Sequence, residues 1–331
     1  MKKLGVIILN WNGLELLKKY LPDAVRHTIS ESADLIVADN GSTDGSVEWV
    51  RSAYPEVKII RFDENFGFAE GYNRAIRQAD YPLVTLLNSD VRVTQGWWQP
   101  IVSFMERHPE AGAVQPKILS DRNPSFFEYA GAAGGYLDRL GYPFCRGRLF
   151  DHCEEDRGQY DTPPTEVAWA SGACLTMPRD LYLKLGGLDP KFFAHQEEID
   201  LCWRVIRSGK KVYALSDSAV YHLGGGSLPK DNPKKTYLNF RNNLLLLHKN
   251  LPRARGRRLT FVRRLADTLA WGMFLLKGDF KNANAIVKAH RDFSRMAREY
   301  TDLPADDTLS CIPGTKKYAV ISRYLLRKKS I

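Results

Sequence analysis

Apolar runs alternate regularly with helical stretches over the first 90 residues, and this pattern limits the possible folds. Strands are predicted at 6–9, 34–38, 57–61 and 83–87, and helices between them at 13–27, 47–52 and 67–78. Strands that alternate with helices favour a sheet of parallel strands with right-handed crossovers. We therefore predict an α/β fold in which helices flank a mostly parallel sheet.

The start of the chain reads as the first of these strands. Its apolar run, residues 4–9, is interrupted by Asn10 and Trp11. A secretory apolar region needs roughly 7–15 residues, and a membrane-spanning helix needs roughly 18. We therefore expect a buried strand here, and a cytoplasmic location.

The rest of the chain divides into a mixed region and a helical region. Glycines scattered over 113–165 indicate short strands and loops. Further on, we predict a strand over 167–177, a helix over 197–208, two short strands at 212–214 and 219–221, and only helices after about residue 236.

The positive charge is concentrated near the C-terminus. The net charge is +10, and residues 251–331 alone hold 18 Lys and Arg against 7 Asp and Glu. The first 250 residues are therefore almost neutral. A basic segment of this kind is attracted to an anionic surface, either lipid or nucleic acid. No nucleic-acid-binding motif accompanies it, so we expect no nucleic acid partner.

Three polar clusters follow predicted strands. They begin at Asp39 (Asp-Asn-Gly-Ser), at Asp63 (Asp-Glu-Asn-Phe-Gly) and at Asn88 (Asn-Ser-Asp). In open parallel sheets the carboxyl edge of the strands is where ligands bind. Turns and helix N-caps use the same residue types, so each cluster also has a purely structural interpretation. A carboxylate such as Asp90 is also suited to a divalent cation.

A fourth cluster places three acids within four residues, Glu197, Glu198 and Asp200, between Phe192-Phe193 and Cys202-Trp203. Acids suit the first turn of a helix. The apolar flanks predict burial, however, and buried acids tend to have raised pKa values and functional roles. Arg204 is spaced to orient Asp200. Farther along, His222 precedes Gly224-Gly225-Gly226 and is either structural or a metal ligand.

In their order and spacing, these clusters resemble glycosyltransferase family 2, which has the GT-A fold, and within it the bacterial rhamnosyltransferase-like enzymes. The resemblance covers roughly residues 4–245 and implies a catalytic domain over 1–245. Its nucleotide-sugar half would be about 1–112 and its acceptor half about 113–245, followed by a basic, amphipathic helical segment over 246–331.

The resemblance also implies the site residues. Asp39 would contact the nucleotide base, and the segment ending at Asp90 would be the family's Asp-x-Asp-type motif, with Asn88 in place of its usual first Asp. Asp90 and His222 would bind Mn²⁺ or Mg²⁺. The catalytic acids would be Glu197, Glu198 and Asp200, with the base being either Glu197 or Glu198. Nucleotide-sugar contacts are expected from Asn10, Asp39, Asn65, Gly67, Asn73, Asn88 and Asp90.

The implied activity is inverting transfer of a sugar from a UDP- or dTDP-sugar to a polyprenyl-phosphate-linked saccharide in cell-surface polysaccharide synthesis. Two other functions remain open. A sugar nucleotidyltransferase would need a glycine-rich loop with a basic residue near the N-terminus, which residues 8–13 lack. A non-catalytic, membrane-associated nucleotide-sugar-binding protein would not need the acids at 197–200.

The basic segment contains an amphipathic stretch over 259–276. On a helical wheel Phe261, Leu265 and Leu269 share one arc, and Arg263 and Asp267 lie on the other. Two interpretations follow. The apolar arc packs on the catalytic domain, or it lies at the inner face of the cell membrane while nearby arginines meet anionic headgroups.

Overall fold

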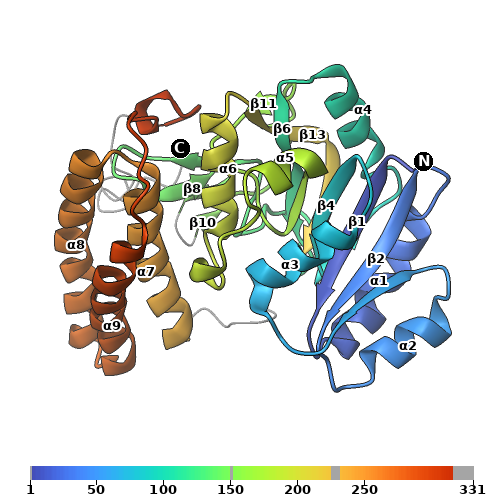
Figure 1. The fold of residues 1–331 in the computed structure, drawn as a ribbon, viewed down its shortest axis with the longest axis horizontal. Helices are drawn as coiled ribbons and strands as arrows, with labels where there is room; N and C mark the ends of the chain where they lie inside the picture. The colour runs from blue at the N-terminus through green and yellow to red at the C-terminus, as the bar shows by residue number, and fades with distance from the viewer. Residues whose placement is uncertain (1, 150–151, 225–231, 316–331) are drawn as a thin grey trace.

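A nine-stranded sheet runs through the centre of the molecule (Figure 1). The computed structural model describes residues 2–149, 152–224 and 232–315. The strands follow the order β11 (Thr165–Glu166), β13 (Lys211–His222), β6 (Ala111–Ser120), β12 (Cys174–Pro178), β4 (Leu83–Asn88), β1 (Leu4–Asn10), β2 (Ala33–Asn40) and β3 (Lys58–Phe62), and β5 (Val91–Val93) pairs with β13.

The sheet is mixed but mostly parallel, as predicted. Strands β4, β1, β2 and β3 are parallel neighbours, and so are β6 and β13. Between the two groups, β12 runs antiparallel to both β4 and β6. The register pairs Asn10 with Asp39 and Leu9 with Asn88, so the carboxyl ends of β1, β2 and β4 meet at one edge.

Helices cover both faces of the sheet. One core contains buried side chains of α1 (Leu14–Thr28), α2 (Ser46–Ala53) and α4 (Gln99–Arg107). The other contains side chains of α3 (Gly67–Gln78), α5 (Arg179–Lys184), η1 (Pro190–Phe192) and α6 (Glu197–Arg207). Four of these helices, α1, α2, α3 and α6, lie within two residues of their predicted bounds, because their apolar spacing is strong.

Two strand predictions were wrong. The strand predicted over 167–177 begins only at Cys174, because Ser171 makes a turn: its carbonyl accepts from the Cys174 N–H and its hydroxyl from the Ala173 N–H. The two short strands at 212–214 and 219–221 are one strand, β13. An irregularity between Leu215 and Ala219 absorbs the polar residues between them while the pairing with β6 continues.

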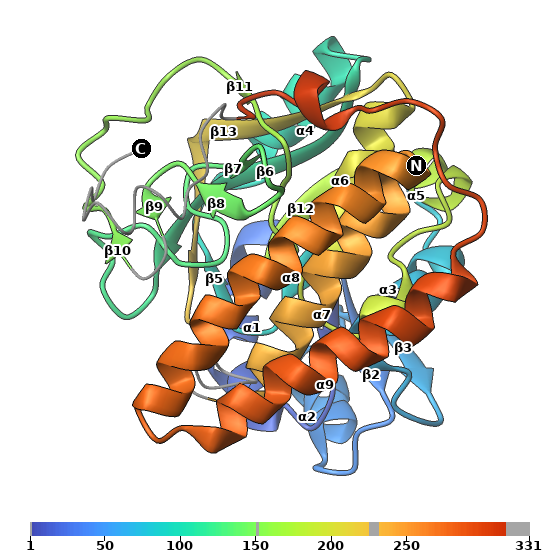
Figure 2. The same ribbon diagram turned by 90° about the vertical axis from the view of Figure 1, so that its left-hand side faces the viewer.

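The region 113–165 contains short strands, as predicted. Beyond β6, strands β7 (Gly135–Leu137), β8 (Pro143–Cys145), β9 (Arg148–Leu149) and β10 (His152–Cys153) form a separate antiparallel sheet. This small sheet lies beside the C-terminal helices (Figures 1 and 2), and the carbonyls of Leu140 and Gly141 in its β7–β8 turn accept from Arg263 and Asn243.

The C-terminal region is helical, again as predicted. It contains α7 (Pro233–Asn250), α8 (Arg253–Leu276) and α9 (Phe280–Met296), followed by the 3₁₀ turns η2 (Ala297–Glu299) and η3 (Leu309–Cys311). Figure 2 shows the three long helices as one layer in front of the sheet. The domain boundary that we predict near residue 245 falls inside α7.

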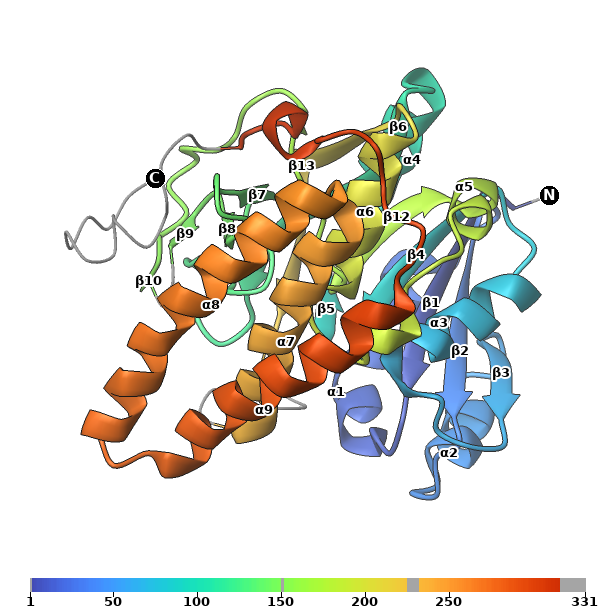
Figure 3. The ribbon, with the colours of Figure 1, turned by 60° about the vertical axis from the view of Figure 1, so that its left-hand side comes forward.

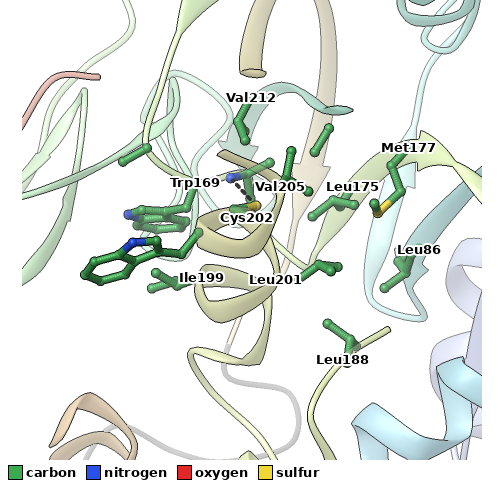
Figure 4. Close-up of a cluster of buried hydrophobic side chains, with 14 of the residues drawn as sticks. Leu86, Trp169, Leu175, Met177, Leu188, Ile199, Leu201, Cys202, Val205 and Val212 are labelled. Atoms are coloured by element: carbon green, nitrogen blue, oxygen red, sulfur yellow. Dashed lines mark hydrogen bonds between the residues drawn. The ribbon is translucent and has the colours of Figure 1, made fainter. Parts of the chain in front are cut away.

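A dense apolar cluster fixes the position of α6. Figure 4 shows Leu201, Cys202 and Val205 of α6 beside Leu175 and Met177 of β12, all of them completely buried. Close packing of this kind resists movement of the helix. The acidic residues of the first turn of α6 are therefore held in a fixed place relative to the sheet.

Candidate active site

The carboxyl ends of β1 and β2 form a buried polar cluster. The Asn10 amide N–H₂ donates to Asp39 Oδ2 at 3.1 Å, to Ser42 Oγ at 3.1 Å and to Ser46 Oγ at 2.9 Å. The other carboxylate oxygen of Asp39 accepts from the Ser42 N–H at 3.0 Å. Asp39 is completely buried, so its contact with a nucleotide base stays a prediction.

A second group of asparagines organises the start of α3. Asn65 Oδ1 accepts from the Gly67 N–H at 2.8 Å and from the Asn40 amide at 2.9 Å. Asn73 bonds both the N–H and the C=O of Leu188, and it also accepts from the Tyr182 hydroxyl. These bonds tie α3 to the segment that leads to α6. Nucleotide-sugar contacts of Asn65, Gly67 and Asn73 stay predictions, and the amide of Asn73 is already fully engaged.

Asp90 and His222 come together at the same edge of the sheet. Strand pairing sets His222 of β13 opposite Val91 of β5, directly beside Asp90. The His222 Nε2 lies 3.1 Å from Asp90 Oδ1, and its Nδ1 lies 3.1 Å from Glu128 Oε2. Burial alone would lower the pKa of His222, but the two carboxylates outweigh burial and raise the pKa to about 10. The two carboxylates therefore favour the protonated, positively charged imidazole.

Glu128 is a member of this group that the sequence analysis missed. It lies in the loop after β6 and is buried, and its Oε2 accepts from the Ala130 N–H at 2.6 Å. Gly224 has a φ of +62°, and a Cβ on it would lie 2.5 Å from Glu128 Oε1. The positive φ and the close approach of this carboxylate both favour glycine at this first position of the three. A loop glutamate 94 positions away left no signal in the sequence.

The geometry of Asp90 and His222 fits a divalent cation. Two ligands at right angles, each bonded at about 2.1 Å, lie about 3.0 Å apart, close to the 3.1 Å between Nε2 and Oδ1. Carboxylate and imidazole together suit Mn²⁺ or Mg²⁺, with imidazole favouring Mn²⁺. Within the described residues, no three or more His, Cys, Asp or Glu side chains are grouped to hold a metal. The protein would supply two ligands, and nucleotide and water oxygens the others.

The backbone turn after Ser171 links the acidic cluster to the end of β4. Asn88 at the end of β4 donates its N–H to the Ala173 carbonyl at 3.0 Å. The neighbouring Gly172 faces Glu198, since a Cβ there would lie 3.6 Å from Glu198 Cβ. The structure thus brings Glu198 and the segment 88–90, which are far apart in sequence, to the same edge of the sheet.

The three acids at the start of α6 have different surroundings. Glu198 is partly accessible, whereas Glu197 is buried and its Oε2 has no hydrogen-bond partner among the residues that the structure describes. Partial burial, which removes water from the carboxylate, raises the pKa of Glu198 to about 7. Burial, together with the charge of Glu198, raises the pKa of Glu197 well above its usual value. Glu198 is therefore the acid that a substrate hydroxyl can reach.

Asp200, unlike these two glutamates, is held in an ion-pair network. Its Oδ2 accepts from Arg204 at 2.7 Å and from Lys249 at 2.8 Å, and its Oδ1 accepts from Asn250 at 2.8 Å. Burial opposes ionisation, but the charges of Arg204 and Lys249 lower the pKa of Asp200. The pairing with Arg204 agrees with its predicted spacing. The surroundings of Asp200 give no support to the catalytic role that we expected for it.

A strained loop leads into this helix, and α7 holds it. Phe193, His195 and Gln196 all have φ near +70°, a region that costs a non-glycine residue about 1–3 kcal/mol. The buried Asn242 amide of α7 donates to the carbonyls of Phe192, Ala194 and His195 at 2.7–2.9 Å. The only sequence signal for this clamp was the polar triplet 241–243 ahead of four leucines.

Comparison with known proteins agrees with this geometry. A model of "Glycosyl transferase family 2" matches residues 5–156. An N-acetylglucosaminyl-diphospho-decaprenol L-rhamnosyltransferase of Mycobacterium tuberculosis is 30% identical over 207 residues, which are 57% of this chain and 66% of that enzyme. The chain thus spans slightly less than two thirds of that relative's length.

Solved structures share the fold at low identity. S. aureus TarS 1–349 in complex with UDP-GlcNAc has a TM-score of 0.58 at 15% identity, covering 89% of this chain and 81% of that one. The mannosyltransferase PcManGT from Pyrobaculum calidifontis, in complex with GDP-Man and Mn²⁺, has a TM-score of 0.54 at 14% identity, covering 88% and 87%. These likenesses confirm the predicted GT-A-type fold. From the family model, the rhamnosyltransferase relative and the fold together, the chain belongs to glycosyltransferase family 2.

Proposed function

We propose that this protein transfers a sugar from a nucleotide-sugar donor to a hydroxyl of a lipid-linked saccharide, with inversion at the anomeric carbon. The observation that carries the proposal is the meeting of a partly accessible, high-pKa glutamate, Glu198, with the pair Asp90 and His222 at one edge of the sheet. A base and a cation-binding pair are the two groups that such a transfer needs.

The reaction is a single displacement. The acceptor oxygen bonds to the anomeric carbon, while the bond from that carbon to the diphosphate oxygen breaks. Glu198 takes the proton of the acceptor hydroxyl, and the nucleoside diphosphate departs with the bonding electron pair. Attack from the face opposite the leaving group inverts the configuration. A bound Mn²⁺ or Mg²⁺ would stabilise the negative charge of the diphosphate as a Lewis acid.

Asp90 and His222 would hold that cation, and Glu128 would orient His222. A histidine that binds a metal through one ring nitrogen usually donates the N–H of the other to a carboxylate or carbonyl, which fixes the orientation of the ring and its tautomer. Glu128 stands at that position, 3.1 Å from Nδ1. Asn88 and Asp39 remain the proposed contacts to the nucleotide, along with Asn10, Asn65, Gly67 and Asn73.

The lipid-linked acceptor is supported by the name of the mycobacterial relative, which acts on a diphospho-decaprenol. The donor base is proposed to be uracil or thymine, and one structural neighbour contains UDP-GlcNAc. The pathway that we propose is cell-surface polysaccharide synthesis at the inner face of the membrane.

A thermal-shift screen of nucleotide sugars, with and without Mn²⁺, tests the donor and the cation. Because a ligand of the folded state raises stability, the correct donor should raise the melting temperature more with Mn²⁺ than without it. Asp90→Ala should abolish the Mn²⁺-dependent part. Glu128→Gln, which keeps the side-chain volume, should weaken Mn²⁺-dependent UDP binding about 10- to 100-fold in calorimetry. Unchanged Mn²⁺-dependent affinity in Asp90→Ala would show that the cation site is wrong.

A further inference from the structure

Helix α8 is amphipathic, but its apolar face points outward, whereas a helix packed on a core turns its apolar face inward. The face that points outward is apolar, with Phe261 64%, Leu265 55% and Leu269 61% exposed. The face that packs inward is polar and buried. Arg263 lies over the Tyr142 ring and donates to the Leu140 carbonyl, and Asp267 pairs with His290 at 2.9 Å. The apolar arc seen in the sequence is therefore left without a partner within the described residues.

The exposed apolar surface continues across the turn between α8 and α9. Leu276 at the end of α8 is 91% exposed, and Phe280 at the start of α9 is 68% exposed. Lys277 and Lys281 are exposed beside them. Figure 3 shows this turn at the outer end of the helical layer, away from the sheet. We call the turn and the outer face of α8 the hairpin surface. Contiguous apolar surface of this kind marks a binding site.

The hairpin has a large excess of positive charge, although Asp279 in the turn is a partly exposed acid whose carboxylate accepts from the Asn282 amide at 2.7 Å. Helices α8 and α9 contain ten Arg and Lys and only two acids, Asp267 and Asp292. Both aspartates are buried, and Asp292 accepts from the Tyr237 hydroxyl at 2.8 Å. The outward-facing charges of the two helices are therefore all positive. Leucine and phenylalanine ringed by lysine and arginine suit the headgroup and acyl boundary of an anionic bilayer.

The hairpin turn lies on the same side of the molecule as the active site. Thr236 in the first turn of α7 donates to Asn282 in the first turn of α9 at 2.6 Å. The same end of α7 adjoins the loop before the catalytic glutamates: Lys234 Nζ lies 4.8 Å from the centroid of the Phe193 ring, and Gln196 donates to the Asn239 carbonyl. A surface that meets the hairpin turn is thus near the loop that presents Glu198.

From these contacts we infer that the hairpin surface is a membrane-docking site, with Leu276 and Phe280 inserted among the lipids and Lys277 and Lys281 at anionic headgroups. The inference rests on the proposed lipid-linked acceptor and gives it a geometry, because docking through this turn brings the catalytic edge toward the bilayer. No helix in the described part of the chain is long and apolar enough to cross a membrane.

Vesicle co-sedimentation of the full-length chain tests the docking site. The chain should bind vesicles of phosphatidylcholine with phosphatidylglycerol at low salt, bind phosphatidylcholine alone much less, and be partly released at high salt. The double variant Leu276→Gln, Phe280→Gln should lose at least about tenfold in affinity. Lys277→Ala with Lys281→Ala should lose about fivefold for each lysine. The matched control is the double variant Arg51→Ala, Lys184→Ala, which removes two positive charges from α2 and α5. This control should bind the vesicles nearly as tightly as the wild type does.

Either of two results would overturn the inference. Wild-type binding by the Leu276→Gln, Phe280→Gln variant would show that the turn does not insert. The intact chain could instead fail to bind anionic vesicles and form dimers in sedimentation velocity. If the Leu276→Gln, Phe280→Gln variant is then monomeric, the surface is an interface between two copies. Vesicle binding needs no donor and the thermal shift needs no vesicles, so a failure here is distinct from a failure of the proposed transfer reaction.

Discussion

At the scale of single residues, accessibility decides which glutamate can act as the base. Glu197 and Glu198 are adjacent in sequence and both have raised pKa values. Only Glu198 is partly accessible, and it faces Gly172, where the absence of a side chain leaves space. The sequence left the choice between the two open because both fit the family pattern. The direction of each side chain depends on where the first turn of α6 sits.

Glu198→Gln should keep donor affinity and lower turnover about 100- to 10,000-fold, since it removes the proton acceptor with little change in volume. The base acts only when ionised, and its pKa is raised to about 7. Wild-type turnover should therefore fall as the pH drops through about 7, and the residual rate of the variant should not follow that titration. Steady-state kinetics over pH 5–9 measures both. Glu197→Gln is the matched control, and a larger loss there than in Glu198→Gln would reassign the base.

At the scale of elements, α7 both packs in the core and holds the loop before α6 in place. Its leucines at 244–247 are buried in the core, while Arg241 and Asn242 hold the strained loop before α6 through backbone carbonyls of residues 191–195. Backbone strain at a functional site persists only where the surroundings impose it. The helix that follows the catalytic sheet in sequence therefore shapes the active site.

Asn242→Leu should disturb that loop, because it keeps the size of the side chain but removes its bonds to the carbonyls of Ala194 and His195 and one of the two donors to the Phe192 carbonyl. We expect a loss of about 1–3 kcal/mol in the free energy of unfolding and a fall in kcat with little change in donor KM. Urea denaturation and steady-state kinetics measure these. Asn284→Leu, the same change at an exposed position of α9, should shift stability by no more than about 0.5 kcal/mol. Equal effects at the two positions would argue against the clamp.

At the scale of the whole molecule, the C-terminal helices are joined to the catalytic sheet by buried charge. Lys249 pairs with Asp200 at 2.8 Å and with Asp189 at 2.7 Å, and Asn250 donates to Asp200. Asp200 itself is completely buried, and two of these partners, Lys249 and Asn250, follow the domain boundary predicted near residue 245. The helical layer thus has one buried, fixed side and one exposed, apolar side.

Asp200→Asn should destabilise the whole chain by about 3–5 kcal/mol, because it leaves the charges of Arg204 and Lys249 without their buried partner. The pKa of Asp200 is lowered in the folded state, so its contribution is present at neutral pH and lost as the pH falls below the usual range of a carboxyl group. Urea denaturation at neutral and acidic pH should therefore show a gap between wild type and variant that narrows in acid. A gap that stays constant with pH would contradict this.

Local pattern was enough for the sheet and for the order of the functional clusters. Buried strands followed by polar turns predicted β1, β2 and β4, and with them the shared edge of Asn10, Asp39 and Asn88, because a parallel arrangement brings carboxyl ends together whatever the details of packing. The sequence also predicted that α8 has an apolar and a polar arc.

Only the tertiary structure decided the contacts between distant segments. Glu128 beside His222, Asn242 beneath the strained loop and Lys249 beside Asp200 each join residues whose own neighbours in sequence carry no sign of the pairing. The same holds for α8. Its sequence predicted an apolar and a polar face, but the polar face is the buried one because Arg263 packs on Tyr142 and Asp267 pairs with His290. Periodicity is a property of one segment, whereas burial is a property of the segments that pack against it.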